Sequence, residues 1–491
     1  MTTKKAAKAP LGAIRNSAAI KSINQIIYSP WSVGFLGVFT LIAFVFSLEV
    51  EFYTVVVLYA IYVALFADDF APLMPLFALC YITPAVKNNP GMSDQGLFYG
   101  STAICLGVTV SVGVLVLLLR ITFDKSFGWR RMFTMKRTLA VGLLALGTSY
   151  LLSGIGHEQY LEYAKGNLLF ALIQFASLFL LYFIFSCTVK WEKFDLDYFA
   201  WTGLIIGLVV AAEVCIIYIV NDVFVGSSIL RERIYSGWGC YNNIGAMISL
   251  SIPFAFYFAC TKKRSSLFFA VACLLLIAVF FSASRGSTLG AVIIFLISLG
   301  YTFFKCKNKK EFRISLLILV GIIAVCELVF HEQLSRAFEM IPGLSHVDND
   351  QVVLDDSGRI EIYKNGIKIF LRHPIFGQSF YPIEYDLYSF SQLQQFKSFF
   401  PPRWHNTVVQ MLTSCGLVGM IAYSYHRIDT IRLFWKKRTT INTFIFFYMI
   451  TLLIMSLLDC HFFNVGPVLF YSTALAVAEF GQENAKKRLS K

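Results

Sequence analysis

Long apolar runs recur along almost the whole sequence, and no other feature restricts the fold as strongly. Runs of about 17 or more apolar residues are long enough to cross roughly 30 Å of hydrocarbon as an α-helix. The chain has 491 residues, of which 57% are hydrophobic and only 14% are charged. A soluble domain does not have this composition, and a transmembrane barrel would show short segments of alternating polarity instead. The sequence therefore predicts an all-α, polytopic membrane protein.

The apolar runs predict about fourteen transmembrane helices. The expected spans are residues 32–46, 53–66, 71–86, 97–119, 138–152, 168–188, 199–220, 244–260, 267–281, 288–304, 314–330, 407–423, 441–458 and 465–478. Prolines interrupt the third span, which is also compatible with a re-entrant segment. The predicted organisation is a basic N-terminus (1–31), a first block of spans (32–330), one large loop (331–405), a last block of spans (406–480) and a tail (481–491).

Positive charge predicts the sidedness of these spans. Basic residues gather at the N-terminus and in the segments 120–137, 262–264, 305–313 and 427–438. With the N-terminus inside, about thirty of the 42 Lys and Arg residues face the cytoplasm, as the positive-inside rule requires. Both termini are then cytoplasmic and the 331–405 loop is extracytoplasmic. This sidedness explains the net charge of +13 better than a nucleic-acid partner does.

The large polar loop is predicted to contain one amphipathic helix. Ser357 can cap its start, and apolar residues then recur at helical spacing to form a single stripe, namely Ile360, Tyr363, Ile367 and Phe370. His373 precedes a proline and ends the helix, because the residue before proline avoids the helical region. Arg359 lies in the first turn. A helix N-terminus with an arginine beside it can bind a phosphate group.

Two further residues are candidates for chemistry. Arg285 is the one charge in the short turn 282–287 between two spans, and an arginine fork suits bidentate phosphate binding. Such an arginine can also simply extend to the membrane interface. His405 follows two prolines and Trp404 at the predicted membrane rim, and Asn406 can cap the next span. A neutral imidazole there could accept a proton from an attacking hydroxyl.

Together these segments resemble the O-antigen ligase and polymerase family over about residues 230–425. The resemblance rests on Ser284-Arg285-Gly286, Gly358-Arg359, His373-Pro374-Ile375-Phe376-Gly377, His405-Asn406-Thr407, Gly416-Leu417-Val418-Gly419, and the stretch 233–253 with Asn243 before an apolar span. The sequence departs from the family after Gly377, where Gln378 and Ser379 replace a common second glycine.

The resemblance implies an inverting, metal-independent glycosyltransferase of the GT-C type in the bacterial cytoplasmic (inner) membrane. Such an enzyme moves a glycan from an undecaprenyl-pyrophosphate carrier to an acceptor hydroxyl outside that membrane, in polysaccharide biosynthesis and cell envelope biogenesis. By position, Arg285 and Arg359 would hold the pyrophosphate and His405 would activate the acceptor. No cofactor is implied. Three more arginines are candidates for donor binding, namely Arg231, Arg233 and Arg403.

Other readings stay open at this point. A metal-dependent GT-C transferase using a lipid-monophosphate sugar could act through Glu49, Glu51 or Asp348, which begins an Asp-x-Asp pattern. A polysaccharide flippase or other transporter is the non-enzymatic alternative, and Glu213, inside a span, would suit it. Ligase and polymerase differ only in the acceptor. The 11 cysteines form no CxxC pair, and a disulfide bond between Cys240 and Cys460 has no motif to support it.

Overall fold

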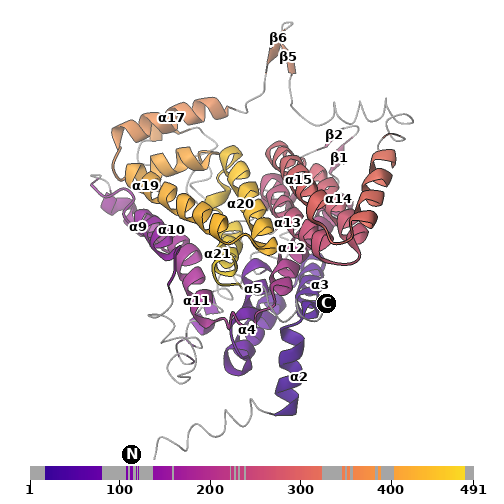
Figure 1. Cartoon of the computed structure of the whole chain (residues 1–491). Coiled ribbons are helices and arrows are strands. Elements are labelled where there is room, and N and C mark those ends of the chain that lie inside the picture. The colour runs from indigo at the N-terminus through magenta and orange to yellow at the C-terminus, as the bar shows by residue number, and fades with distance from the viewer. Residues whose placement is uncertain are drawn as a thin grey trace, which may run out of the picture.

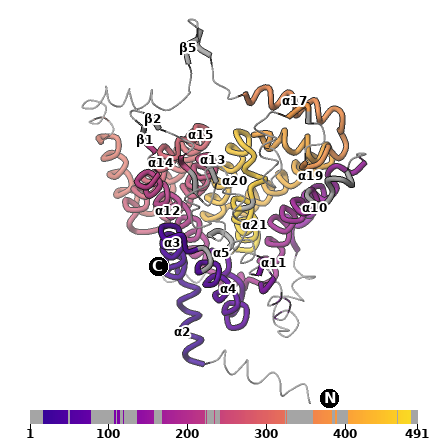
Figure 2. The backbone as a smooth tube through the Cα atoms, turned by 180° about the vertical axis from the view of Figure 1, so that it is seen from behind, coloured from indigo at the N-terminus to yellow at the C-terminus, as the bar shows by residue number. Residues whose placement is uncertain are grey.

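The computed structural model describes most of the helical part of the chain. The described residues are 17–79, parts of 107–120, 136–156, 160–221, most of 223–324, 346–348, 351–353, 358–381, 385–388 and 403–481. Within them the protein is a bundle of helices with three small two-stranded ribbons, as Figures 1 and 2 show from opposite sides.

The N-terminal half of the bundle consists of the following elements. They are α2 (Ala18–Ile27), α3 (Pro30–Phe46), α4 (Glu49–Phe66), η2 (Ala71–Leu73), α5 (Met74–Leu79), α9 (Ala140–Leu151), α10 (Tyr160–Phe175), η3 (Ala176–Leu180), α11 (Leu181–Thr188) and α12 (Leu196–Val220). Two ribbons follow, β1 (Phe224–Val225) with β2 (Ser228–Ile229), and β3 (Tyr235–Ser236) with β4 (Gly239–Cys240), both antiparallel.

The C-terminal half contains the remaining elements. They are α13 (Tyr241–Thr261), α14 (Ser265–Phe281), α15 (Arg285–Lys305), β5 (His346–Asp348), β6 (Gln351–Val353), α17 (Arg359–Arg372), η5 (Tyr385–Leu387), α19 (Thr407–Lys436), α20 (Thr440–Leu458), η6 (His461–Phe463) and α21 (Val465–Phe480). The central helix is α13, which packs against α12, α14, α15 and α20.

Six helices among the described residues are long and apolar enough to cross a membrane, or seven if the bent pair α2 and α3 counts as one span. Four shorter apolar helices lie at predicted spans as well: Glu51–Phe66, Ala140–Leu151, Ser265–Phe281 and Gly466–Phe480. The chain is therefore a membrane protein. The full count of about fourteen spans stays a prediction, since much of the fourth and part of the eleventh lie outside the described residues.

The third predicted span is interrupted in the structure. Residues 71–79 form the short 3₁₀ turn η2 followed by the six-residue helix α5, with Pro72 in the first and Pro75 in the second. Proline removes a backbone donor and crowds the preceding turn, so it favours breaks of this kind. Residues 80–86 lie outside the described part.

The helix of the twelfth predicted span begins at Thr407 as expected, but it runs past the predicted end. The helix α19 does not end near residue 423 but continues to Lys436, and it is broken at Gly416, whose φ is +62° and ψ −155°. It is thus two helical segments joined at a kink. Most of the basic stretch expected as a loop after this span is therefore helical.

Arg427 illustrates this correction. It was predicted in a solvated basic segment, but its guanidinium lies 4.8 Å from the ring of Tyr423 and 4.6 Å from that of Phe462. Nη1 donates to the Tyr471 hydroxyl at 3.2 Å. Cation–π contacts of this kind are strongest where water is excluded. Arg427 therefore holds α19, η6 and α21 together.

The helix ends predicted to share one side of the membrane do lie together. At one end of the bundle, the Lys262 ammonium contacts the Asp197 carboxylate at 2.5 Å, and the backbone N–H of Lys307 donates to Cys260 at 3.0 Å. At the other end, the backbone N–H of Gly154 donates to Phe376 at 3.1 Å. The alternation of the spans over this part of the chain is consistent with the predicted pattern.

Candidate functional site

The site begins at the start of α15. The expected turn 282–287 is shorter in the structure, because Arg285 is already the first residue of the helix. Ser284 is the N-cap, and its side chain accepts a hydrogen bond from the backbone N–H of Ser287 at 3.4 Å. An N-cap of this kind satisfies a donor that would otherwise be left at the helix start. Arg285 is therefore held on a capped first turn.

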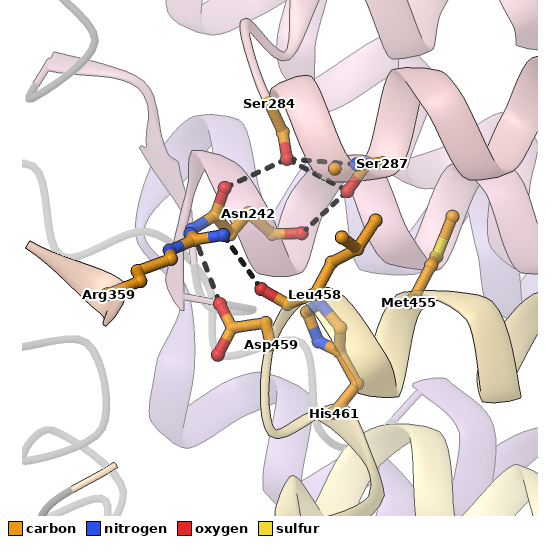
Figure 3. A pocket seen from close by; sticks show the side chains of 9 residues that line it. Asn242, Ser284, Ser287, Arg359, Met455, Leu458, Asp459 and His461 are labelled. Carbon is orange, nitrogen blue, oxygen red and sulfur yellow. Dashed lines mark hydrogen bonds between the residues drawn. The ribbon is translucent and has the colours of Figure 1, made fainter. Parts of the chain in front are cut away.

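Asn242, in the first turn of α13, connects this turn to the rest of the site. Its side-chain oxygen accepts from the Ser284 hydroxyl at 2.8 Å, and its backbone oxygen accepts from the Ser287 hydroxyl at 3.2 Å. On the other side, its amide nitrogen donates to the Asp459 carboxylate at 3.3 Å. Figure 3 shows these contacts converging on one small polar network.

Asp459 is the centre of that network. It follows α20 directly, is buried, and accepts from the backbone N–H of Cys460 at 2.7 Å. Its carboxylate lies 3.3 Å from Nδ1 of His405. Burial alone raises the pKa of the carboxyl, but nearby His405, His461 and Arg403 outweigh it and hold the pKa of Asp459 well below its usual range. Asp459 is therefore an anion that faces His405, His461 and Arg403.

His405 is fixed in an unusual backbone conformation. Its φ is +49°, in the left-handed region that non-glycine residues rarely adopt. The Tyr363 hydroxyl donates to the backbone oxygen of His405 at 3.0 Å, and Asn406 caps α19 by accepting from Val408 at 2.8 Å. If Nδ1–H donates to Asp459, Nε2 is the unprotonated nitrogen that can accept a proton. The predicted cap at Asn406 is confirmed.

Arg359 brings the loop helix α17 into the same place. Its Nη1 donates to the backbone oxygen of Leu458 at 2.9 Å, one residue before Asp459. Arg359 lines a small pocket. The other lining residues are Asn242, Ser284, Gly286, Ser287, Met455, Leu458, Asp459 and His461 (Figure 3). The pocket thus joins elements from α13, α15, α17 and α20.

The start of α17 differs from the prediction. Gly358, not Ser357, is the N-cap, and its φ of +72° is one that glycine adopts without strain. Its end agrees with the prediction, because His373 is the C-cap. The helix therefore begins with Arg359 itself.

The turn after α17 is inserted into the break of α19. The backbone N–H groups of Leu417 and Val418 donate to Pro374 and Ile375 at 2.8 and 3.1 Å. In return, Gln378 donates to Thr413 at 2.9 Å. The kink at Gly416 leaves these donors and acceptors without partners inside α19. The motifs that contain Gly377 and Gly416 therefore form one joint, which fixes α17 beside His405.

His461 also lines the pocket. It lies in the turn η6, is buried, and has Nδ1 3.3 Å from the Asn464 amide nitrogen. Burial, opposed by the Asp459 charge, lowers the pKa of His461 to about 4. The ring is therefore neutral near pH 7 and adds polarity to the pocket without adding charge.

The predicted site residues fall into two groups. Arg359 and His405 meet through Leu458 and Asp459, and Arg403 lies close enough to contribute to the charge around Asp459. Arg285 adjoins the pocket through its neighbours Ser284 and Gly286, but its own side chain is not part of the lining. Arg233 is exposed, and Arg231 lies outside the described residues.

The segments that contain the acidic residues of the metal-dependent alternative lie in separate parts of the structure. Glu49 and Glu51 lie in the first turn of α4, which packs on α3 and η2, and Glu51 is exposed. Asp348 ends strand β5, and Figure 1 shows the β5–β6 ribbon standing apart from the bundle. Among the described residues, no group of three or more His, Cys, Asp or Glu side chains is arranged to hold a metal ion.

Two smaller questions from the sequence are also answered. Cys460 is a buried free thiol, so the considered disulfide bond with Cys240 is not formed. Glu213 is fully buried within α12, as expected for an ionisable residue inside a span.

Sequence reasoning missed Asn242, Asp459 and His461. One signal was available for two of them: Asp459 and His461 are polar residues placed between two apolar runs on the predicted outer side. That signal is weak without structure, because a charge at the end of a span is usually only solvated. Asn242 precedes Asn243, which had been noted, but nothing in the sequence tells which of the two faces the site.

Comparison with known proteins supports the expected relationship. A family model described as O-antigen ligase matches residues 269–424, which include Arg285, Arg359 and His405. No curated protein matches the chain. The matched segment contains α15, α17 and most of α19, and Asn242 and Asp459 lie outside it on either side.

Proposed function

From the match of residues 269–424 to a family model described as O-antigen ligase, we propose that the protein transfers a glycan from an undecaprenyl-pyrophosphate carrier to an acceptor hydroxyl on the outer side of the cytoplasmic membrane. The family match itself indicates an O-antigen ligase or related membrane glycosyltransferase with lipid-linked glycan substrates. The donor lipid, the side of the membrane and the roles of individual residues are the proposal.

In this proposal the arginines bind the leaving group. Arg359 lies at the N-terminus of α17, where the helix dipole also favours an anion. Arg285 occupies the first turn of α15, at the corresponding end of another helix. Two arginines at two helix starts can neutralise the charge that develops on the pyrophosphate as it leaves. Arg403, Arg233 and Arg231 are proposed to assist in donor binding.

His405 is the proposed base. The acceptor oxygen attacks the anomeric carbon of the donor sugar from the face opposite the pyrophosphate, so the configuration inverts. The bond between that carbon and the phosphate oxygen breaks, and undecaprenyl pyrophosphate leaves with the electron pair. Nε2 of His405 takes the hydroxyl proton, and Asp459 stabilises the imidazolium through Nδ1. The pyrophosphate is a good leaving group, so no metal is required in this scheme.

One observation carries the proposal. Arg359, Asp459 and the Ser284–Ser287 turn line one pocket, and His405 contacts it through Asp459, although these residues come from distant parts of the chain. A base with its orienting carboxylate, placed beside an arginine, is what acyl or glycosyl transfer to a hydroxyl needs.

The test is a transfer assay with purified protein in nanodiscs and an undecaprenyl-pyrophosphate-linked oligosaccharide, with chelator present. A ladder of product lengths indicates a polymerase, and one shifted product that requires an added acceptor indicates a ligase. Product that appears only with added divalent metal would replace this proposal with the metal-dependent transferase. No product under any condition would favour the transporter.

Substitutions test the residues. We expect Arg285→Ala, Arg359→Ala and His405→Ala each to reduce transfer by about 10²-fold or more while the protein still inserts at its normal level. Asp348→Ala serves as the control and should leave transfer nearly unchanged. Near-normal transfer in all three variants would show that the site lies elsewhere.

A further inference from the structure

The apolar stripe predicted for α17 does not simply pack on the bundle. Ile360 is 55% exposed, Ile367 is 39% exposed and Leu371 is 69% exposed. These three residues are spaced by seven and four, so they lie on one edge of the helix. Ile375, just beyond the helix, is also exposed at 59%. An exposed apolar edge of this length marks a surface that contacts a membrane or another molecule.

A different face of α17 contacts the protein. Ile369 is fully buried and forms a small core with Tyr388, Trp404 and Val409. Gly366 lies so close to this core that a Cβ there would be 2.6 Å from Val409 and 2.9 Å from Trp404. The helix therefore packs on α19 through one face, and its apolar edge is not part of that contact.

The position of the lipid boundary can be read from α19. Beyond the kink, its exposed apolar side chains recur on one side of the helix from Leu417 to Trp435, namely Leu417, Ile421, Tyr425, Ile428, Ile431 and Trp435. At 1.5 Å per residue this stripe is roughly 27 Å long. That length matches the roughly 30 Å hydrocarbon core of a bilayer. The stripe is therefore long enough to face the hydrocarbon from Leu417 at one end to Trp435 at the other.

The exposed edge of α17 continues this lipid-facing stripe. The backbone N–H of Val418 donates to Ile375 at 3.1 Å, so exposed Ile375 lies beside exposed Leu417. From Ile375 the apolar edge runs back through Leu371 and Ile367 to Ile360. Figures 1 and 2 show α17 lying across the end of the bundle rather than along it. The helix is thus placed near the boundary plane.

Positive charge flanks the apolar edge. Lys364, Lys368 and Arg372 are exposed and follow one another at four-residue spacing. Glu361, the acidic residue of the helix, lies 4.0 Å from Lys364. Basic residues beside an exposed apolar edge are typical of helices that lie in a membrane interface, where they contact lipid phosphates.

We propose that α17 is an interfacial helix: its edge Ile360, Ile367 and Leu371 dips into the adjacent membrane leaflet, and Lys364, Lys368 and Arg372 contact phospholipid phosphates. The occupant of the exposed edge is the lipid surface itself. This placement does not depend on the proposed function. Combined with it, α17 holds Arg359 at the depth where the pyrophosphate of a lipid-linked donor lies, and that last step rests on the proposed function.

The test measures the depth of single positions in nanodiscs containing phosphatidylglycerol. A genetically encoded fluorescent amino acid replaces Leu371, with Glu361 as the aqueous control and Ile421 as the lipid control. Phospholipids carrying a nitroxide near the headgroup should quench the Leu371 probe at least twofold more than the Glu361 probe. Iodide in the buffer should quench them in the opposite order.

A charge variant tests the basic residues separately. Lys368→Glu with Arg372→Glu should reduce the lipid quenching of the Leu371 probe, while the Ile421 probe stays unchanged. Equal iodide quenching at Leu371 and Glu361 would overturn the proposal and leave a protein partner as the occupant of this edge. Fluorescence quenching does not depend on glycan transfer. Failure of the glycosyltransferase proposal would therefore leave the interfacial placement of α17 intact.

Discussion

Asp459 shows how one side chain can organise a site assembled from distant segments. It accepts hydrogen bonds from the α13 residue Asn242 and from its own neighbour Cys460, and it contacts His405 at the start of α19. Hydrogen bonds to both oxygens of a buried carboxylate offset the cost of removing it from water. In the proposed mechanism, Asp459 is a positioning residue that acts through His405.

Asp459→Asn should lower the rate of transfer by about 10²-fold or more, because an amide neither fixes the imidazole tautomer nor stabilises the imidazolium. The loss should fall on kcat more than on KM, and the pH profile of transfer should change shape. Asp429→Asn is the matched control, since Asp429 is also buried but pairs with Arg432 at 3.3 Å instead. Unchanged kcat in Asp459→Asn would exclude this role.

His461 predicts a pH dependence of stability. Its pKa is about 4 in the folded protein and about 6.5 when unfolded, so the unfolded chain binds more protons between these values. The stabilising contribution is therefore complete above about pH 6.5 and is lost as the pH falls toward 4. Thermal unfolding in nanodiscs should show a falling Tm over this window. The fall should be shallower in His461→Gln, and an identical slope would contradict the assignment.

At the residue scale, the sequence could indicate Arg359 and His405 because each lies in a distinctive local setting. Arg359 starts an amphipathic helix, and His405 lies between a proline pair and a helix cap. Asp459 has no such setting. Its importance arises only when α20 ends beside α13 and α19, which is a property of packing between segments more than 50 residues apart.

The helices of the bundle were largely predictable, but the break inside α19 was not. Apolar runs located α12, α13, α14, α15 and α20 to within a few residues. The kink in α19 was missed, because Gly416 lies in an apolar run where a glycine is usually tolerated within a helix. What breaks the helix is the turn 374–379, which supplies alternative hydrogen-bond partners, and local sequence does not reveal that contact.

Gly416→Ala tests the joint between this turn and α19. A Cβ at Gly416 would lie 2.4 Å from the backbone oxygen of Ile375, in a conformation that alanine disfavours. We expect a loss of about 2 to 5 kcal/mol of stability from the clash and the left-handed backbone together. Gly300→Ala, in α15 with no atom within 4 Å of its Cβ, is the control and should be neutral or slightly stabilising. Similar Tm values for both variants would rule out the joint.

At the scale of the whole molecule, the distribution of charge predicts the orientation. The loop with α17 should be extracytoplasmic and both termini cytoplasmic. A green fluorescent protein fused to the C-terminus should fluoresce, and alkaline phosphatase fused there should be inactive. Alkaline phosphatase inserted between β5 and β6 should be active. The reverse result at both positions would show the opposite orientation in the membrane, with the site in the cytoplasm.

The joint at Gly416 also has a consequence for biosynthesis. The segment that completes α19 is made after the turn 374–379, but the two are hydrogen-bonded to each other. If the loop is extracytoplasmic, as the distribution of charge predicts, it must be translocated before the second half of α19 can form these hydrogen bonds. The insertion machinery then has to select the apolar stripe that begins at Leu417, since residues 407–415 form a separate segment before the kink. Correct export of the loop and correct insertion of this helix are thus a single event.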